Sequence, residues 1–227
     1  ENVKDKGKVV TISNKAFEEK DDYIVNMRYS ASLCGAAAQI AYEKGFFDKY
    51  GVNVNMVKSD DSSTADLIST NKIDAGQAMI PNATMKMENG LNVNMALGLH
   101  SGCFYILTAK DSNINDVSEL KDKKIAVMGL GSDGAALVRR TLAAKGLNTS
   151  VDNMDFEFVV YPESEMAMAL ENNLVDAVAV EDPVAGNLVD NGTAKILLSN
   201  ASDEEFKDEA CCSLMLRPDF VNEHPVL

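Results

Sequence analysis

The chain has 227 residues, of which 46% are hydrophobic and 25% are charged, and its formal net charge at pH 7 is −14. This composition is typical of a globular protein with a sizeable core, and the length allows one large domain or two lobes of about 100 residues each. The acidic excess argues against binding to nucleic acid and against general adhesion to anionic membranes, because both need a basic face.

The N-terminal segment contains no signal for targeting or membrane insertion. No apolar run approaches the roughly 18 residues of a membrane span, and no basic segment precedes an apolar one as in a signal peptide. Because the first residue is Glu1 rather than Met, we expect a mature or trimmed form. Residues 1–22 are rich in Lys, Glu, Asp and Asn, which favours a solvated tether or an added edge strand at Val9–Ile12.

The first half of the chain predicts alternating strands and helices. Strands are expected at Val25–Tyr29, Val52–Val57, Ala75–Ile80, Val93–Leu99 and Phe104–Ala109, and helices at Gly35–Lys44 and Ala65–Asn71. Gly45 ends the first helix, Pro81 closes the third strand, and residues 100–103 separate the last two strands.

The same pattern then restarts. Strands are expected at Lys124–Met128, Phe156–Tyr161, Ala177–Val180, Lys195–Leu198 and Ser213–Leu216, and helices at Ala135–Lys145 and Glu163–Glu171. Gly146 ends the first of these helices. Strands that alternate with helices predict an α/β fold with parallel sheets and helices on both faces.

An internal repeat supports a division into two lobes. Asp74-Ala75 and Pro81 recur as Asp176-Ala177 and Pro183, each 102 positions later. Two similar α/β lobes are therefore expected, each with its own sheet. A crevice between such lobes, at the carboxyl ends of the strands, is where ligands bind.

A glycine motif opens the second repeat. Gly129, Gly131 and Gly134 match G-x-G-x-x-G between a predicted strand and helix, the context of a dinucleotide site. An NAD-dependent oxidoreductase is therefore the alternative function, although Asp133 places a negative charge where a pyrophosphate would bind. Two other interpretations stay open: free N–H groups with Ser132 hold a small anion, or Ser132 or Asp133 simply caps the helix.

Five segments, taken in order, carry a family resemblance. They are residues 41–52, 71–75, 98–103, 117–127 and 175–183, within a resemblance that covers the chain from about Val25 to its end. The chain resembles the substrate-binding proteins of ABC importers for nitrate, sulfonates, taurine and thiamine-pyrimidine precursors. The resemblance implies a two-lobed type II periplasmic binding fold, each lobe a mostly parallel sheet flanked by helices.

The resemblance also implies the function and the setting. A small polar or anionic solute would be trapped between the lobes and passed to an ABC permease at the membrane, without catalysis and without a cofactor. The protein would be an extracytoplasmic monomer, at the cell surface or in the periplasm, and lipid-anchored in its full-length form.

The lobe boundaries follow from the same resemblance. Lobe 1 would comprise residues 23–107 and the return segment 206–227, and lobe 2 residues 108–205. Two crossings near Tyr105–Lys110 and Asp208–Leu214 would form the hinge. Because such proteins continue past the equivalent of Pro225, we expect the remainder of lobe 1 to be missing after Leu227.

Ligand contacts are expected at strand ends, in the turns that open helices, and at the hinge. The predicted residues are Tyr29, Ser30, Ser32, Cys34, Gly35, Pro81, Asn82, His100, Ser101, Gly102, Cys103, Gly131, Ser132, Asp133, Gly134, Tyr161, Asp182 and Cys211. Sulfonate and nitrate sites need cations or N–H donors. Arg28, Arg139 and Arg140 are the basic candidates, but their positions relative to the cleft do not follow from the sequence.

Four cysteines allow three interpretations. Cys103 begins one hinge strand and Cys211-Cys212 the other, so the implied fold brings them together. Buried free thiols without a metal are favoured, because cysteine packs as a small apolar residue. The alternatives are a disulfide from Cys103 to Cys211 or Cys212, and a soft site for Cu⁺ or Zn²⁺ formed with Cys34 and His100.

Overall fold

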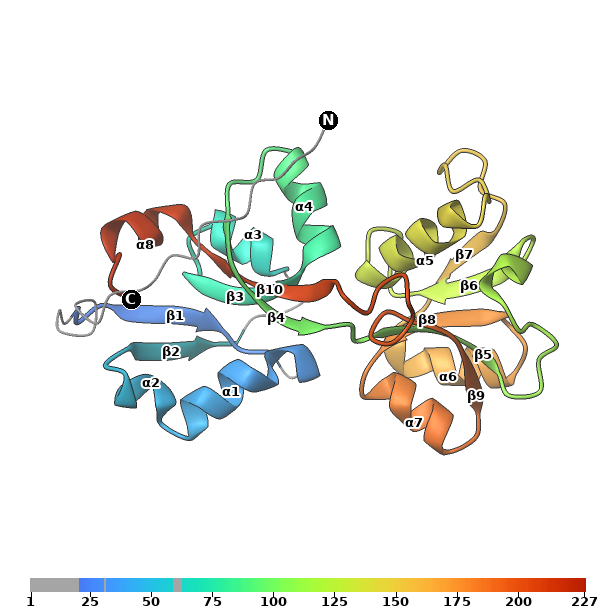
Figure 1. Cartoon of the computed structure of the whole chain (residues 1–227), viewed down its shortest axis with the longest axis horizontal. Helices are drawn as coiled ribbons and strands as arrows, with labels where there is room; N and C mark the ends of the chain where they lie inside the picture. The colour runs from blue at the N-terminus through green and yellow to red at the C-terminus, as the bar shows by residue number, and fades with distance from the viewer. Residues whose placement is uncertain (1–20, 31, 59–62) are drawn as a thin grey trace.

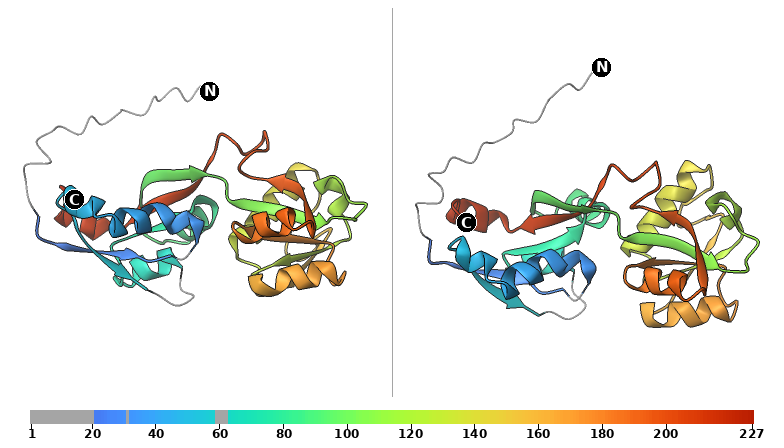
Figure 2. Two further views of the ribbon diagram at one scale, coloured as in Figure 1. Left: turned by 90° about the horizontal axis from the view of Figure 1, so that it is seen from below. Right: turned by 60° about the horizontal axis from the view of Figure 1, so that its bottom comes forward.

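The chain forms two sheets of five strands, which lie side by side along the long axis of the molecule (Figures 1 and 2). The computed structural model describes residues 21–30, 32–58 and 63–227, apart from the side chain of Asn82. The edge strand expected at Val9–Ile12 therefore lies outside the described residues. Within the described ranges, no helix has both the length and the apolar character needed to cross a bilayer.

The two sheets have the same strand arrangement. The first sheet contains, in order, β2 (Asn53–Val57), β1 (Ile24–Arg28), β3 (Ala75–Met79), β10 (Ala210–Leu216) and β4 (Asn94–Ser101). The second contains β7 (Glu157–Val160), β6 (Lys124–Val127), β8 (Ala177–Glu181), β5 (Phe104–Ala109) and β9 (Ala194–Ser199). This shared arrangement confirms the two similar lobes that the internal repeat predicted.

In each sheet, four strands run in one direction and one strand is reversed. The reversed strand is β10 in the first sheet and β5 in the second, and each pairs antiparallel with both of its neighbours. These are the strands that follow the two crossings between the sheets. The expectation of mostly parallel sheets is confirmed, and the exceptions are the strands by which the chain enters each lobe.

Helices cover both faces of each sheet (Figure 1). The first lobe carries α1 (Ala36–Glu43), α2 (Phe46–Lys49), α3 (Thr64–Ser69), α4 (Ile80–Glu88) and α8 (Pro218–Glu223). The second carries α5 (Asp133–Ala144), α6 (Glu163–Glu171) and α7 (Val184–Asp190). In the second lobe, α5 packs on one face of the sheet, and α6 and α7 pack on the other (Figure 1).

Pro81 was expected only to close a strand, and the helix that begins there was not predicted. Pro81 does follow β3, but it stands in the first turn of α4. Proline is accepted there because the first N–H groups of a helix have no intrahelical partner. The repeat holds here too, since Pro183 is the N-cap of α7.

The first crossing lies earlier than predicted. Residues 104–109 form β5 and pair with β8 and β9 inside the second sheet, so the chain crosses at Gly102-Cys103 rather than at Tyr105–Lys110. The second crossing spans residues 200–209, between β9 and β10. The two crossings touch, because a Cβ on Gly102 would lie 2.1 Å from the backbone nitrogen of Ala201.

Asp74 and Asp176 show why the repeat is structural. The Asp74 carboxylate accepts a hydrogen bond from the Asn26 backbone N–H (2.9 Å), and that of Asp176 accepts one from the Lys124 N–H (2.8 Å). Each aspartate thus holds the neighbouring central strand by a backbone N–H, in the middle of β1 and at the start of β6. The same side chain performs the same task in both lobes.

Candidate functional site

A cavity of about 120 Å³ lies between the two lobes, beside the crossings. Met79 and Pro81 line it from the first lobe, and α5 lines it from the second. The second crossing closes it with Asn200, Phe206 and Glu209, and the start of β10 adds Ala210 and Cys211. This cavity occupies the crevice that the repeat predicted.

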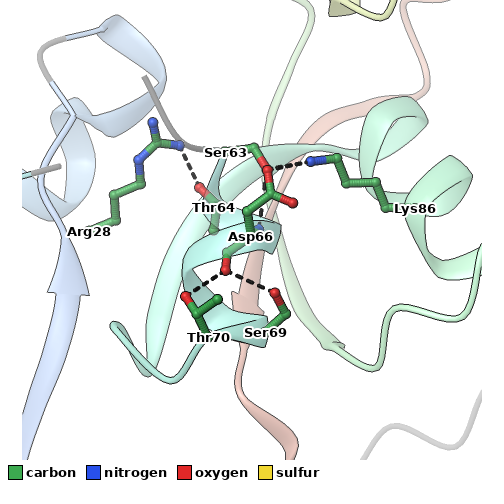
Figure 3. A network of polar contacts seen from close by, with 7 residues as sticks. All are labelled: Arg28, Ser63, Thr64, Asp66, Ser69, Thr70 and Lys86. Carbon is green, nitrogen blue, oxygen red and sulfur yellow. Dashed lines mark hydrogen bonds and ion pairs between the residues drawn. The ribbon is translucent and has the colours of Figure 1, made fainter. Parts of the chain in front are cut away.

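A second cavity of about 80 Å³ adjoins the first, because Met79 and Asp133 line both. Its remaining wall comes from the end of β1, the start of α3, and α4. The residues that supply polar atoms there are Arg28, Ser63, Thr64 and Lys86 (Figure 3). We call the two adjoining cavities the cleft.

Arg28 is the cation of the cleft, and one of its N–H groups remains unused. Its Nη1 donates to Thr64 Oγ1 (2.7 Å; Figure 3). The Thr64 hydroxyl in turn donates to the Gln77 carbonyl (2.5 Å). Arg28 Nε is buried and has no hydrogen-bond partner among the described residues. Burial also lowers the pKa of the guanidinium. A partly desolvated cation with an unused N–H favours binding of an anion.

Lys86 is held by its own lobe. Its Nζ donates to Ser63 Oγ (2.5 Å) and forms an ion pair with Asp66 (2.8 Å) (Figure 3). Hydrogen bonds from Lys86 and Ser63 lower the pKa of Asp66. Asp66 therefore compensates the positive charge of Lys86, which leaves Arg28 as the cation that a ligand would meet at this end of the cleft.

The other end of the cleft is more apolar. Leu137 and Phe206 line it, and Arg140 stacks on the Phe206 ring at 4.7 Å. Arg140 is also bound by Glu209 through two hydrogen bonds of 2.6 Å each. This pair joins α5 to the second crossing and keeps the positive charge of Arg140 compensated.

Four of the predicted residues line the cleft: Pro81, Gly102, Asp133 and Cys211. Four others lie outside the cleft. Tyr161 packs against the core of the second lobe, and Asp182 accepts hydrogen bonds from Tyr105 (3.0 Å) and from the Gly186 N–H (3.1 Å). Tyr29 lies under Lys58 at 5.3 Å. Ser101 borders a shallow surface hollow with His100. The side chain of Asn82 lies outside the described part of the chain.

The turn at Ser30–Gly35 is held by its own side chains. Ser30 and Ser32 share a hydrogen bond (2.9 Å), and the Ser32 side chain does not cap the following helical turn. A Cβ on Gly35 would lie 2.7 Å from the Ser30 Cβ, so only glycine fits there. Neither serine lines the cleft cavities.

The glycine motif is a capped helix start. Ser132 is the N-cap of α5, and its Oγ accepts the Ala135 N–H (3.3 Å), so the predicted cap is present. Gly134 packs against Ala179, whereas added Cβ atoms at Gly129 and Gly131 would meet nothing within 4 Å. Only one of the three glycines is thus required by close packing.

The cysteines converge as expected, and they are free thiols. Cys103 Sγ lies 3.3 Å from Cys34 Sγ and 3.5 Å from Cys211 Sγ, well beyond the roughly 2.05 Å of a disulfide bond. Contacts with the Cys103 and Cys212 thiols lower the pKa of Cys34. Glu181 approaches Cys34 Sγ to 3.9 Å from the second lobe. Burial, followed by the charges on Cys34 and Glu163, raises the pKa of Glu181 to about 8.

Several cleft residues were not placed there from the sequence. Arg28, a basic candidate whose position was left open, is the last residue of β1, and its place at the carboxyl end of a strand is the signal that favours ligand contact. Ser63 caps α3, as a serine before a helix often does. Asn200 and Phe206 lie in a crossing without a sequence motif.

Comparison with known proteins gives a family and a fold. The model of the NMT1-like family matches residues 19–227. No curated protein sequence matches the chain. Among solved structures, the periplasmic aliphatic sulphonate-binding protein SsuA from Escherichia coli has a TM-score of 0.74 at 17% identity, over 90% of this chain and 68% of that one.

Two further structures agree. The alkanesulfonate-binding protein SsuA from Xanthomonas axonopodis pv. citri, bound to MOPS, has a TM-score of 0.70 at 18% identity, over 92% of this chain and 70% of that one. The periplasmic nitrate-binding protein NrtA from Synechocystis PCC 6803 has a TM-score of 0.70 at 23% identity, over 89% of this chain and 57% of that one. The two-lobed fold of periplasmic binding proteins is confirmed.

Proposed function

Because the chain belongs to the NMT1-like family, we propose that it is the solute-binding component of an ABC importer, and that its solute is a small organic anion of the sulfonate type. In this proposal the protein acts outside the cytoplasm as a monomer, attached by a lipid anchor in its full-length form. It passes the solute to a membrane permease without chemical turnover.

Arg28 carries this proposal. After a small rotation of the Arg28 side chain, the sulfonate would accept the Nε–H, which is buried and has no partner among the described residues, and the guanidinium would compensate its charge. The organic part of the solute would extend from the small cavity toward Met79, Leu137 and Phe206 in the large one. Asp133 lines both cavities, so an amino group on the solute would meet a carboxylate, as in an aminosulfonate.

Isothermal titration calorimetry tests the proposal with ethanesulfonate, taurine and nitrate. We expect Arg28→Gln to weaken sulfonate binding by about 10- to 100-fold, the value of one charge-assisted hydrogen bond. Arg139→Gln is the matched control, because Arg139 donates to the Leu130 carbonyl (2.7 Å), stacks on Phe158 and lines neither cavity. Arg139→Gln should bind the sulfonate with the affinity of the wild type.

The outcomes separate the alternatives. Asp133→Asn should weaken taurine binding and leave ethanesulfonate binding intact if the carboxylate meets an amino group. If Arg28→Gln and Arg139→Gln lose the same amount of sulfonate affinity, Arg28 does not bind the sulfonate. Binding of NAD or NADP, with none of the anions bound, would instead support the oxidoreductase interpretation.

A further inference from the structure

A compact group of sulfur and nitrogen donors lies at the junction of the two lobes, and the proposed solute site does not use it. The group consists of Cys34, His100, Cys103 and Cys212, whose ligand atoms all lie within 4.8 Å of one another. Cys34 comes from the turn before α1, His100 from β4, Cys103 from the first crossing and Cys212 from β10. We call these four residues the thiol–imidazole cluster.

The imidazole of His100 is oriented like a metal ligand. Its Nδ1 donates to the Ser101 carbonyl (2.8 Å), which places the ring proton on that nitrogen. Its Nε2 is buried and has no hydrogen-bond partner among the described residues. A histidine that binds a metal characteristically uses one ring nitrogen for a backbone carbonyl and presents the lone pair of the other to the ion.

The sulfurs are close, buried and reduced. Cys103 and Cys212 are 7% and 1% exposed, and Cys34 is half-buried. A tetrahedral zinc site with Zn–S distances of about 2.3 Å separates its sulfurs by about 3.8 Å. The 3.3 Å between Cys34 and Cys103 and the 4.8 Å limit for the whole cluster bracket that value. Small side-chain rotations therefore suffice to surround an ion.

Cys211 supplies a contrast within the same strand. It lies next to Cys212 in β10, but its sulfur is 3.6 Å from Asn200 Nδ2, which donates to it, and it lines the cleft. It is not one of the four donors. Cys211 also lies 3.5 Å from the Cys103 sulfur, so it borders the cluster without being one of its four donors.

We propose that Cys34, His100, Cys103 and Cys212 bind a thiophilic metal ion, Zn²⁺ or Cu⁺, in addition to the solute held in the cleft. Three cysteines and one histidine are a ligand set of tetrahedral zinc sites, and soft thiolates also select Cu⁺. On binding, each coordinating thiol loses its S–H proton to solvent, and a metal–sulfur bond forms in its place. The ion joins the turn before α1 to β4, to the first crossing and to β10.

Metal titration of the reduced, chelator-treated full chain tests the proposal. Zn²⁺ is added in competition with a chromophoric chelator, and Cu⁺ in competition with a Cu⁺-specific one, and the bound metal is counted by native mass spectrometry. We expect one equivalent of at least one of the two ions. Co²⁺ in place of Zn²⁺ should give the charge-transfer and ligand-field absorption of a tetrahedral thiolate site.

Two matched variants locate the site. Cys212→Ser should weaken metal binding by at least about 10-fold, whereas Cys211→Ser should have a clearly smaller effect, because Cys211 lies beside the donor Cys103 but is not one of the four donors. Cys34→Ser changes only a half-buried side chain, so it keeps the test valid if Cys212→Ser fails to fold. Absence of metal binding by the reduced wild type would overturn the proposal, as would equal losses in Cys211→Ser and Cys212→Ser.

Discussion

Asp74 accepts more hydrogen bonds from the surrounding structure than its counterpart in the second lobe. Its side chain is 5% exposed, pairs with Arg217 (2.7 Å), and accepts hydrogen bonds from the Asn26 N–H and the Tyr23 hydroxyl (3.1 Å). Asp176 is 36% exposed, and Lys123 is 3.8 Å away. The two equivalent aspartates of the repeat therefore differ in environment: Asp74 is buried and Asp176 is partly exposed to solvent.

We expect Asp74→Asn to lower the free energy of unfolding by about 3 to 5 kcal/mol, because it leaves the charge of Arg217 buried without its partner. Asp176→Asn, the control, should cost about 1 kcal/mol, since solvent screens its ion pair. Urea unfolding followed by circular dichroism measures both. Similar costs in the two variants would show that the burial of the first pair has no energetic effect.

Single residues also show what the sequence predicts and what it does not. The convergence of Cys103 with Cys212 followed from the hinge strands that the family resemblance implies. The importance of Arg28 did not, because it depends on the Thr64 hydroxyl and on burial by α3, and neither contact has a signature in the sequence. The role of Tyr161 was overestimated, since a strand end lies beside the core as well as beside the crevice.

At the level of elements, the strands were predictable and some helices were not. The strands follow from alternating or continuous apolar residues bounded by glycine and proline, and ten of them appear at the expected places. The short helices α2, α4, α7 and α8 were missed. Three of them start at or beside a proline. In a sequence, proline is taken as the end of a strand or helix, but it is also accepted in the first turn of a helix.

The contact between the two crossings gives a prediction about elements. Gly102→Ala places a methyl group against the backbone of Asn200 and Ala201, so the crossings must separate. We expect the free energy of unfolding to fall by about 1 to 3 kcal/mol, as at other overpacked sites. Gly129→Ala is the control, because a Cβ there meets nothing within 4 Å and the backbone has no positive φ.

Differential scanning calorimetry and hydrogen exchange separate a local from a global effect. Gly102→Ala should speed amide exchange at the start of β5 and near Asn200, where the Phe104 N–H donates to Asn200 Oδ1 (2.8 Å). Gly129→Ala should leave exchange there unchanged. A Gly102→Ala protein with wild-type stability and exchange would show that the crossings tolerate separation.

For the whole molecule, two lobes joined by two short crossings favour closure around a solute. Small-angle scattering should show a smaller radius of gyration when a bound sulfonate contacts both lobes. Arg28→Gln should keep the unliganded radius at a sulfonate concentration that saturates the wild type, while Arg139→Gln should compact normally. Compaction of Arg28→Gln at that concentration would contradict the role given to Arg28.

The strand order also determines when each lobe can be completed during synthesis. The second sheet uses only residues 104–199, whereas the first sheet needs β10 between β3 and β4, and β10 ends at Leu216. The lobe that begins first along the chain is thus finished last. We expect the second lobe to fold on the ribosome while β1 to β4 still wait for their partner, so that nascent chains are most prone to misfold in the interval before β10 emerges.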